Sequence, residues 1–188
     1  YNYGDVYGFG MAGGFFAQVR GCSTYMENCY NYGDVSSEYR ISGGLIGFGQ
    51  YNNGPMTFVR CENHGNISCN YVKSNGGIGG FVGQTVDVIS GVDTTLYFYD
   101  CVNTGIMTGN PTALVNKKRS EYHIGSFVGS SANSAFKMEL CRNYNTDTDY
   151  AYGFSGGKKP DVTDCFDASV LGRVQTGTTN WGTFNLAN

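Results

Sequence analysis

Asparagine and aspartate occupy every second position of one short segment near the end of the sequence, in a pattern that could bind a hard cation. The segment contains Asn143, Asn145, Asp147 and Asp149. In an extended chain these side chains would lie on one side, and amide and carboxylate oxygens are ligands that Ca²⁺ prefers. The segment lacks the glycine and the bidentate glutamate of an EF-hand loop. It is therefore a candidate Ca²⁺ site, with a solvated terminal repeat as the alternative, and no other cofactor is indicated.

A second set of residues could bind a ligand through aromatic rings. Tyr3, Tyr32, His64 and Tyr144 occupy equivalent places in a repeated pattern, in which Thr104 fills the remaining copy. On an extended chain these side chains would align on one outward face. Tyrosine can stack on sugar rings or anchor a protein partner, but it also suits the exposed face of a strand. The column is therefore a candidate site for a glycan or a host surface protein, with a structural role as the alternative.

The pattern that relates these positions is Cys-x-Asn-x-Gly-x-apolar. Clear copies begin at Cys29, Cys61 and Cys101, and degraded copies begin at Cys141 and Cys165. Self-similarity of this kind indicates a repeat architecture, and the unequal spacing of the copies suits a solenoid whose rungs carry loops of different lengths. The string YNYGDV occurs at residues 1–6 and again at residues 30–35, directly after a cysteine. This recurrence predicts that the chain is a fragment of a longer array.

Stacked repeats would place like residues above one another. The expected interior column of thiols consists of Cys29, Cys61, Cys101, Cys141 and Cys165. The expected ladder of amides consists of Asn31, Asn63, Asn103 and Asn143, with Asn2 before it and Asp167 after it. Buried amides must be hydrogen bonded, and a ladder pairs each amide with that of the next rung. These cysteines and asparagines are therefore predicted to be structural.

Two further segments recur with the cysteine motif. A glycine doublet precedes an apolar pair, as in residues 43–46 and 79–82, and alternating apolar residues precede each cysteine, with a corner expected just before it. Three short strands per rung with glycine-rich corners predict an all-β fold, a parallel β-helix or β-solenoid of about five rungs. The array should span residues 1–171. Residues 172–188 lack the motif and are expected to form a cap or the start of another module.

Composition narrows the classes of function. The net charge is −3, and a chain of this charge has no electrostatic footprint for nucleic acid. No run of about 18 apolar residues is present, so membrane insertion is not expected. Seven cysteines is an odd number, and Cys22 and Cys69 lie outside the repeated column. These two are therefore the better candidates for a disulfide or a reactive thiol.

The combination of this cysteine motif with Gly-Gly-apolar-apolar-Gly, as in Gly43–Gly47, resembles the GLUG-type repeats of bacterial cell-surface proteins. The resemblance covers about residues 1–171. It implies a β-solenoid in an extracellular, cell-surface setting, where such repeats occur in large secreted proteins that include adhesins. It further implies spacing, adhesion or fibre building as the function, with end-to-end stacking on neighbouring repeats or on other copies of the chain.

The expected function is therefore a non-catalytic extracellular structural or adhesive segment that acts as a surface stalk, an adhesin or a fibre-forming unit. One alternative is a carbohydrate-binding module that uses the outward tyrosine column. A second alternative is a polysaccharide-processing β-helix enzyme, which would need two acids facing each other across a cleft. Asp87, Asp93 and Asp100 lie near one another in the sequence and are the nearest approach to such a pair.

Overall fold

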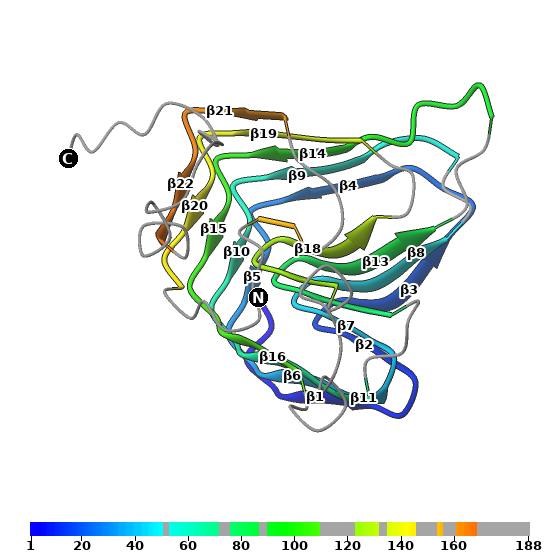
Figure 1. Ribbon diagram of the computed structural model, residues 1–188, viewed down its shortest axis with the longest axis vertical. Helices are drawn as coiled ribbons and strands as arrows, with labels where there is room; N and C mark the ends of the chain where they lie inside the picture. Colours follow the sequence, from blue (N-terminus) through cyan, green and yellow to red (C-terminus); the bar gives the residue numbers. More distant parts are fainter. Residues whose placement is uncertain are drawn as a thin grey trace, which may run out of the picture.

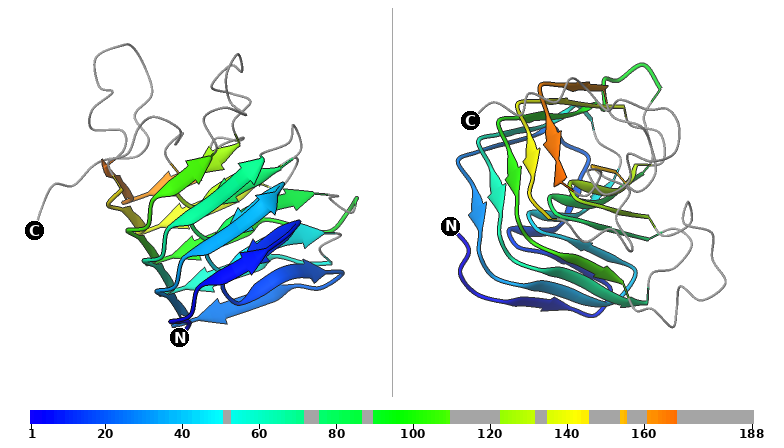
Figure 2. Two further views of the ribbon diagram at one scale, coloured as in Figure 1. Left: turned by 90° about the horizontal axis from the view of Figure 1, so that it is seen from below. Right: turned by 60° about the vertical axis from the view of Figure 1, so that its left-hand side comes forward.

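The fold is a stack of short parallel β-strands wound into a solenoid, as the sequence predicts (Figure 1). The computed structural model describes residues 1–50, 53–71, 76–86, 90–109, 123–131, 135–145, 154–155 and 161–168. In Figure 2 successive rungs lie one above another, from the N-terminal rung in blue to the last described strands in orange. Among the described residues, no helix has the length and hydrophobicity needed to cross a membrane.

The strands form five parallel sheets, each with one strand per rung. Sheet A contains β5 (Tyr30–Asn31), β10 (Glu62–Asn63), β15 (Val102–Asn103), β20 (Arg142–Asn143) and β22 (Phe166–Asp167). Sheet B contains β1 (Val6–Gly8), β6 (Val35–Tyr39), β11 (Ile67–Tyr71) and β16 (Met107–Gly109). Sheet C contains β2 (Met11–Gly13), β7 (Ile41–Gly43), β12 (Gly77–Gly79) and β17 (Ile124–Gly125). Sheet D contains β3 (Phe16–Arg20), β8 (Ile46–Gln50), β13 (Val82–Val86) and β18 (Val128–Ser131). Sheet E contains β4 (Thr24–Glu27), β9 (Met56–Val59), β14 (Leu96–Tyr99), β19 (Phe136–Glu139) and β21 (Asp161–Thr163).

Each complete rung has five strands, so the expectation of three strands per rung is wrong. The three repeated segments are present, but two of them contain a corner. The glycine doublet separates the sheet C strand from the sheet D strand, and the cysteine motif bends at its glycine between sheets A and B. Register follows the motif: Asn63 pairs with Asn31 and Asn103, and Ile67 pairs with Val35 and Met107.

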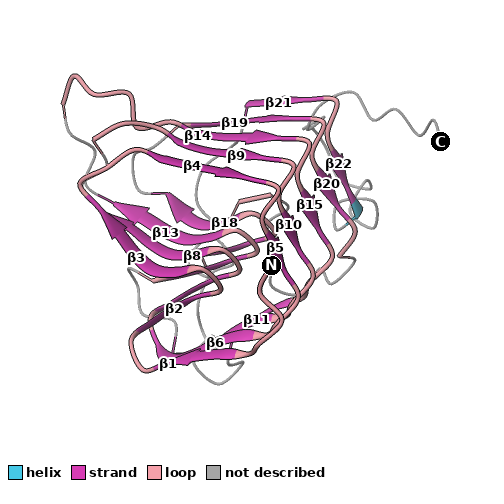
Figure 3. Ribbon diagram, turned by 180° about the vertical axis from the view of Figure 1, so that it is seen from behind, coloured by secondary structure: helices cyan, strands magenta, loops and turns pink. Residues whose placement is uncertain are grey.

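Sheets C and D form an arch that folds into the rung, with the glycine doublet at its tip (Figure 3). Each sheet C strand contacts the sheet D strand of the following rung, as β7 contacts β13. Glycine permits this close approach: a Cβ on Gly43 would lie 2.6 Å from the backbone nitrogen of Gly83. The motif Gly-Gly-apolar-apolar-Gly therefore encodes two strands that lie back to back at glycine distance.

The arch divides the interior into two apolar cores. The larger lies among sheets D, E and A, and the smaller lies between sheets B and C. In the larger core, Phe58 stacks on Phe98 with centroids 4.9 Å apart, and Phe81 stacks on Phe127 at 4.5 Å. The two stacks meet edge to face, since Phe81 and Phe98 are 5.6 Å apart at 83°. Like side chains therefore pack on like side chains from rung to rung, which is favourable for aromatic rings.

A left-handed residue makes the expected corner before each cysteine. The residues that directly precede the five motif cysteines have φ between 48° and 56°: Asn28, Arg60, Asp100, Leu140 and Asp164. This backbone region disfavours most side chains, and asparagine and aspartate tolerate it best. The corner reverses the inward-facing parity of the chain, so that the apolar residues of sheet E and the cysteine both face the core.

The arch predicts a large penalty for a side chain at Gly83. A Cβ there would lie 2.6 Å from the Ser42 carbonyl oxygen and 2.7 Å from that of Gly47, so the backbone of two strands would have to move. We expect Gly83→Ala to lower the free energy of unfolding by about 2–3 kcal/mol or more in chemical denaturation. Gly10→Ala is the matched control, because no atom lies within 4 Å of its Cβ position. Equal stability of the two variants would contradict the close approach.

The corner predicts that Leu140→Asn stabilises the protein. Leu140 has φ 56° and is 44% exposed, so the substitution relieves backbone strain and removes little buried apolar surface. We expect a gain of about 1 kcal/mol in the free energy of unfolding. Asn28→Leu is the reciprocal variant at the equivalent corner and should cost a similar amount. A Leu140→Asn protein no more stable than the wild type would show that this corner is unstrained.

Candidate functional site

The asparagine ladder runs through every rung as a chain of side-chain hydrogen bonds. The amide nitrogen of each residue donates to the amide oxygen of the next: Asn2 to Asn31 (2.7 Å), Asn31 to Asn63 (2.8 Å), Asn63 to Asn103 (2.9 Å) and Asn103 to Asn143 (3.0 Å). Asp167 takes the last place and accepts from Asn143 at 2.8 Å. Asn31, Asn63, Asn103 and Asn143 are fully buried.

The second amide hydrogen of each asparagine is also used. It is donated to the backbone carbonyl two residues further on, as from Asn31 to Gly33 (2.8 Å) and from Asn63 to Gly65 (3.0 Å). A backbone carbonyl can only accept a hydrogen bond, so it sets which side of the amide carries the nitrogen. These asparagines therefore have their donors engaged within the protein, which is the requirement for a buried amide.

The tip of the arch packs against this ladder. A Cβ at Gly44 or Gly80 would overlap the side-chain oxygen of Asn63 or Asn103, respectively, together with the carbonyl of the next rung. The second position of the doublet therefore requires glycine, because the asparagine amide lies directly against it. The two repeated motifs meet at this point, between the two apolar cores.

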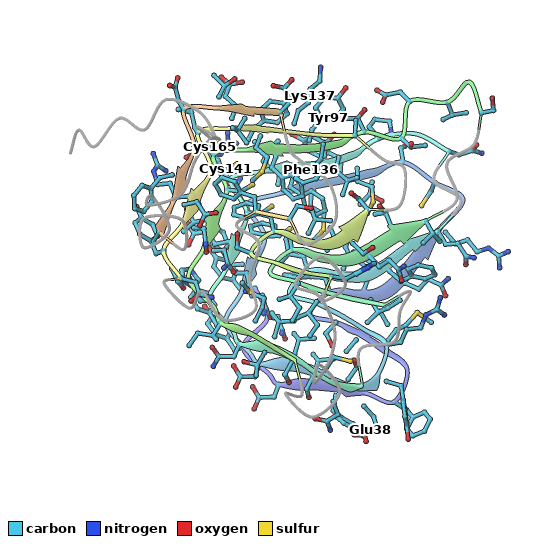
Figure 4. All side chains as sticks on the ribbon, viewed as in Figure 1. Glu38, Tyr97, Phe136, Lys137, Cys141 and Cys165 are labelled. Carbon is cyan, nitrogen blue, oxygen red and sulfur yellow. The ribbon has the colours of Figure 1, made fainter. Side chains whose placement is uncertain are left out.

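The cysteines form an interior column. Cys61, Cys101, Cys141 and Cys165 are buried and Cys29 is half-buried, and Cys141 and Cys165 lie next to each other in Figure 4. Each thiol donates to the backbone carbonyl two residues earlier, at 3.3 to 3.5 Å. A hydrogen bond with Cys101 and burial raise the pKa of the Cys61 thiol, and burial raises that of Cys141. The column is therefore a packed set of thiols in contact from rung to rung.

The structure contains no disulfide among the seven cysteines, all of which belong to its described part. Cys22 is exposed after β3, whereas Cys69 lies in β11 and packs in the smaller core with Ile67. Of the two candidates for a disulfide, Cys22 therefore lies in the bend between β3 and β4, and Cys69 is an interior residue of sheet B.

The aromatic column is a parallel stack in its first three rungs. The ring centroids of Tyr3 and Tyr32 are 5.1 Å apart at 7°, and those of Tyr32 and His64 are 4.8 Å apart at 8°. His64 continues the contact through its Nδ1 atom, which is 2.8 Å from the Thr104 hydroxyl. Tyr144 lies beyond Thr104, where its ring is tilted by 47° against that of Phe166. The structure thus brings Tyr3, Tyr32 and His64 together and leaves Tyr144 apart.

This stacking limits what the column can bind. Both faces of the Tyr32 ring are covered by aromatic rings of the protein, so a sugar ring cannot stack on them. The ring edges and hydroxyl groups remain accessible, with Tyr32 43% exposed and Tyr144 52% exposed. His64 is held further by the Glu62 carboxylate, 2.6 Å from its Nε2 atom. Contacts within the protein therefore explain most of the order in this column.

A second ladder, which the sequence did not predict, follows the bend of the cysteine motif. The side chain of Asp5 accepts the backbone N–H of Asp34 (2.9 Å), Asp34 accepts that of Asn66 (2.8 Å), and Asn66 accepts that of Ile106 (3.2 Å). The signal was present as an aspartate or asparagine directly after the motif glycine in three successive copies. Each side chain stabilises the turn of the rung that follows it.

The candidate Ca²⁺ site receives little support from its described half. The side-chain oxygen of Asn143 already accepts from Asn103 at 3.0 Å and from the backbone N–H of Asn145 at 3.2 Å. Asp147 and Asp149 lie outside the described residues. Within the described ranges, no group of three or more His, Cys, Asp or Glu residues is placed to hold a metal ion.

The described acids considered for glycoside cleavage each interact with different residues of the protein. Asp93 accepts from the Thr95 N–H (3.0 Å) and from the Tyr97 hydroxyl (3.2 Å), and these hydrogen bonds lower its pKa. Asp100 forms an ion pair with Arg142 at 3.1 Å. Asp87 lies outside the described residues. Figure 4 shows Tyr97 and Lys137 on the outer side of sheet E, while Phe136 points into the core.

Comparisons of this chain with protein-family models, with curated proteins and with solved structures found no match. The class of the protein therefore follows from its own geometry. It is a β-solenoid whose repeated polar residues are used in rung-to-rung contacts.

The ladder predicts that Asn103→Ala is strongly destabilising. Removal of this amide leaves the nitrogen of Asn63 and the oxygen of Asn143 without their partner in a buried site. We expect a loss of about 3 kcal/mol or more in the free energy of unfolding, because each unsatisfied buried group costs about 1–3 kcal/mol. Urea denaturation followed by circular dichroism measures it.

Asn70→Ala is the matched control, since Asn70 is an exposed residue whose amide bonds to Glu38 on the neighbouring strand. This variant should lose less than about 1 kcal/mol. If the two variants were equally stable, the buried ladder would contribute no more than an ordinary surface contact.

Proposed function

We propose that this chain is a non-catalytic structural segment of an extracellular cell-surface protein, in which it acts as a stalk, an adhesin segment or a fibre-forming unit. The observation that carries the proposal is the unbroken amide ladder from Asn2 to Asp167. In the ladder and in the thiol column, the repeated polar residues contact the next rung. A chain with this design maintains length and rigidity, which is what a spacer requires.

The resemblance to GLUG-type repeats supports the extracellular setting. The glycines that carry the resemblance are those of the arch, where Gly43 and Gly83 bring two strands together. The motif therefore has an architectural meaning that agrees with a structural role.

We further propose that neighbouring repeats or other copies of the chain stack end to end on this segment. Strands β1, β2, β3 and β4 are edge strands of their sheets. Large apolar side chains on this first rung are exposed, including Tyr7 at 67% and Phe16 at 47%. An open sheet edge with such side chains favours pairing with a further rung.

A carbohydrate-binding function has narrower support. It would have to use Tyr144, whose ring is outside the parallel stack, and the edges of the Tyr3 and Tyr32 rings. Glycan-array binding by the wild type that disappears in Tyr144→Ala would favour this alternative over the structural role.

Insertion of a rung tests the structural role directly. Duplication of residues 61–100 adds one repeat in register, because Cys61 and Cys101 hold equivalent places. The variant should remain folded and should lengthen the particle by about 4.8 Å in small-angle X-ray scattering. An insertion with the same 40 residues in shuffled order is the control, the insert length being the Asn63–Asn103 separation. Loss of the fold on in-register duplication would overturn the spacer proposal.

The location is tested by immunogold electron microscopy of the native full-length protein, with an antibody against the outer face of sheet E at β19, where Lys137 and Glu139 are exposed. We expect label outside the cell, on narrow projections. Label confined to the cell interior would contradict the extracellular proposal.

A further inference from the structure

Four tyrosines form a compact group on the outer side of the first two rungs, here called the tyrosine quartet: Tyr1, Tyr3, Tyr30 and Tyr32. Tyr1 stacks on Tyr30 with centroids 4.9 Å apart at 10°. Tyr3 stacks on Tyr32 at 5.1 Å and 7°. Tyr1 and Tyr3 are 6.0 Å apart at 4°. The quartet therefore places two pairs of phenol rings in face-to-face contact across one rung boundary.

The backbone holds these rings in register. The Asn2 N–H donates to the Tyr30 carbonyl (2.9 Å), and the Tyr32 N–H donates to the Asn2 carbonyl (2.8 Å). The Asn2 side chain adds its 2.7 Å hydrogen bond to Asn31 between the two pairs. The rings also remain accessible to a dissolved oxidant, since Tyr1 and Tyr3 are 72% and 73% exposed. Close contact, fixed register and exposure are thus combined at this one place.

We propose that the tyrosine quartet is a site of oxidative cross-linking, in which Tyr1 couples to Tyr30 and Tyr3 couples to Tyr32 to form dityrosine between the first and second rungs. The co-reactant is hydrogen peroxide, delivered through a haem peroxidase. Each phenol loses an electron and its hydroxyl proton and becomes a phenoxyl radical. Two radicals then form a carbon–carbon bond between their Cε atoms, which lie ortho to the hydroxyl groups.

The two ring hydrogens at the new bond move to the phenolic oxygens, which restores both aromatic rings. Per cross-link, two tyrosines lose two electrons and two protons in total, and one peroxide takes them up to give two waters. Partial burial and the Glu62 carboxylate raise the pKa of Tyr30 and Tyr32, which favours the neutral phenol at both positions.

Tyr97 and Tyr99 are also stacked, with centroids 6.1 Å apart at 7°, but both belong to strand β14, so their contact does not cross a rung boundary. Tyr25 is 65% exposed, but its hydroxyl bonds to Glu27 and it has no stacked ring beside it. Tyr144 contacts Phe166, which carries no phenol and cannot complete the coupling. Tyr25 and Tyr144 are therefore matched controls of similar exposure.

The consequence of the cross-link is mechanical. The rungs that carry Tyr1 and Tyr30 are otherwise held together by noncovalent contacts, such as the hydrogen bond from the Asn2 N–H to the Tyr30 carbonyl. A covalent bond between the rings would prevent these two rungs from separating. The use of the cross-link at a cell surface rests on the proposed function, whereas the coupling itself is a property of the purified chain.

The test is treatment of the purified protein with hydrogen peroxide and a haem peroxidase, followed by tandem mass spectrometry and dityrosine fluorescence. We expect a product two hydrogens lighter per cross-link, in which residues 1–20 are joined to residues 21–40 through quartet tyrosines. Its yield should not depend on protein concentration. Unfolding in urea should reduce this cross-link at least about fivefold, because the fixed geometry is lost.

Variants separate the quartet from general tyrosine oxidation. Tyr30→Phe with Tyr32→Phe should abolish the product that joins residues 1–20 to residues 21–40, while Tyr25→Phe with Tyr144→Phe should retain it. Equal yields from the two double variants, or a product that is mainly intermolecular and rises with protein concentration, would overturn the proposal. A positive result with an intracellular native protein would leave the coupling standing and reject the extracellular function.

Discussion

The fold depends on one constraint: a buried side-chain amide must find a partner for each of its donors. In this chain each asparagine of the ladder meets that requirement with its own rung and the next one. The strands of sheet A are only two residues long, so their few backbone hydrogen bonds alone would fix the pairing of the strands weakly. The amide ladder fixes the register of these short strands, since a slip of one residue would move every asparagine from the interior to the surface.

The rest of the rung is arranged around that ladder. The glycine-lined arch of sheets C and D reaches the amides because its tip has no side chain, as at Gly44. The two cores then fill the space on either side with stacked phenylalanines, thiols and branched residues. The same stacking continues on the outer face, where Tyr3 and His64 cover the two faces of the Tyr32 ring. In the interior and on the surface, side chains thus contact the side chains at equivalent positions of the neighbouring rungs.

Contacts between equivalent positions of successive repeats were predictable from the sequence. The Asn63–Asn103 bond, the buried cysteines and the corner before each cysteine follow from a motif that recurs in a constant order. The arch was not predictable, because it depends on a glycine in one rung that meets a glycine in the next, as Gly43 meets Gly83, and the spacing along the chain does not reveal such a contact. The alignment of Tyr32 with His64 was predicted from the sequence. That the two rings stack closely enough to cover each other's faces was not, because it depends on side-chain orientation.

The amide ladder also has a direction. In every bond between ladder side chains the N–H points toward the following rung, so the two ends of the solenoid are chemically different. An interior rung presents an acceptor to its predecessor and a donor to its successor, which makes interior rungs interchangeable. Asp167 accepts the last of these bonds in the described part of the chain, at a position where an acid replaces the amide. The polarity of the stack is thus set by the direction of its amide hydrogen bonds.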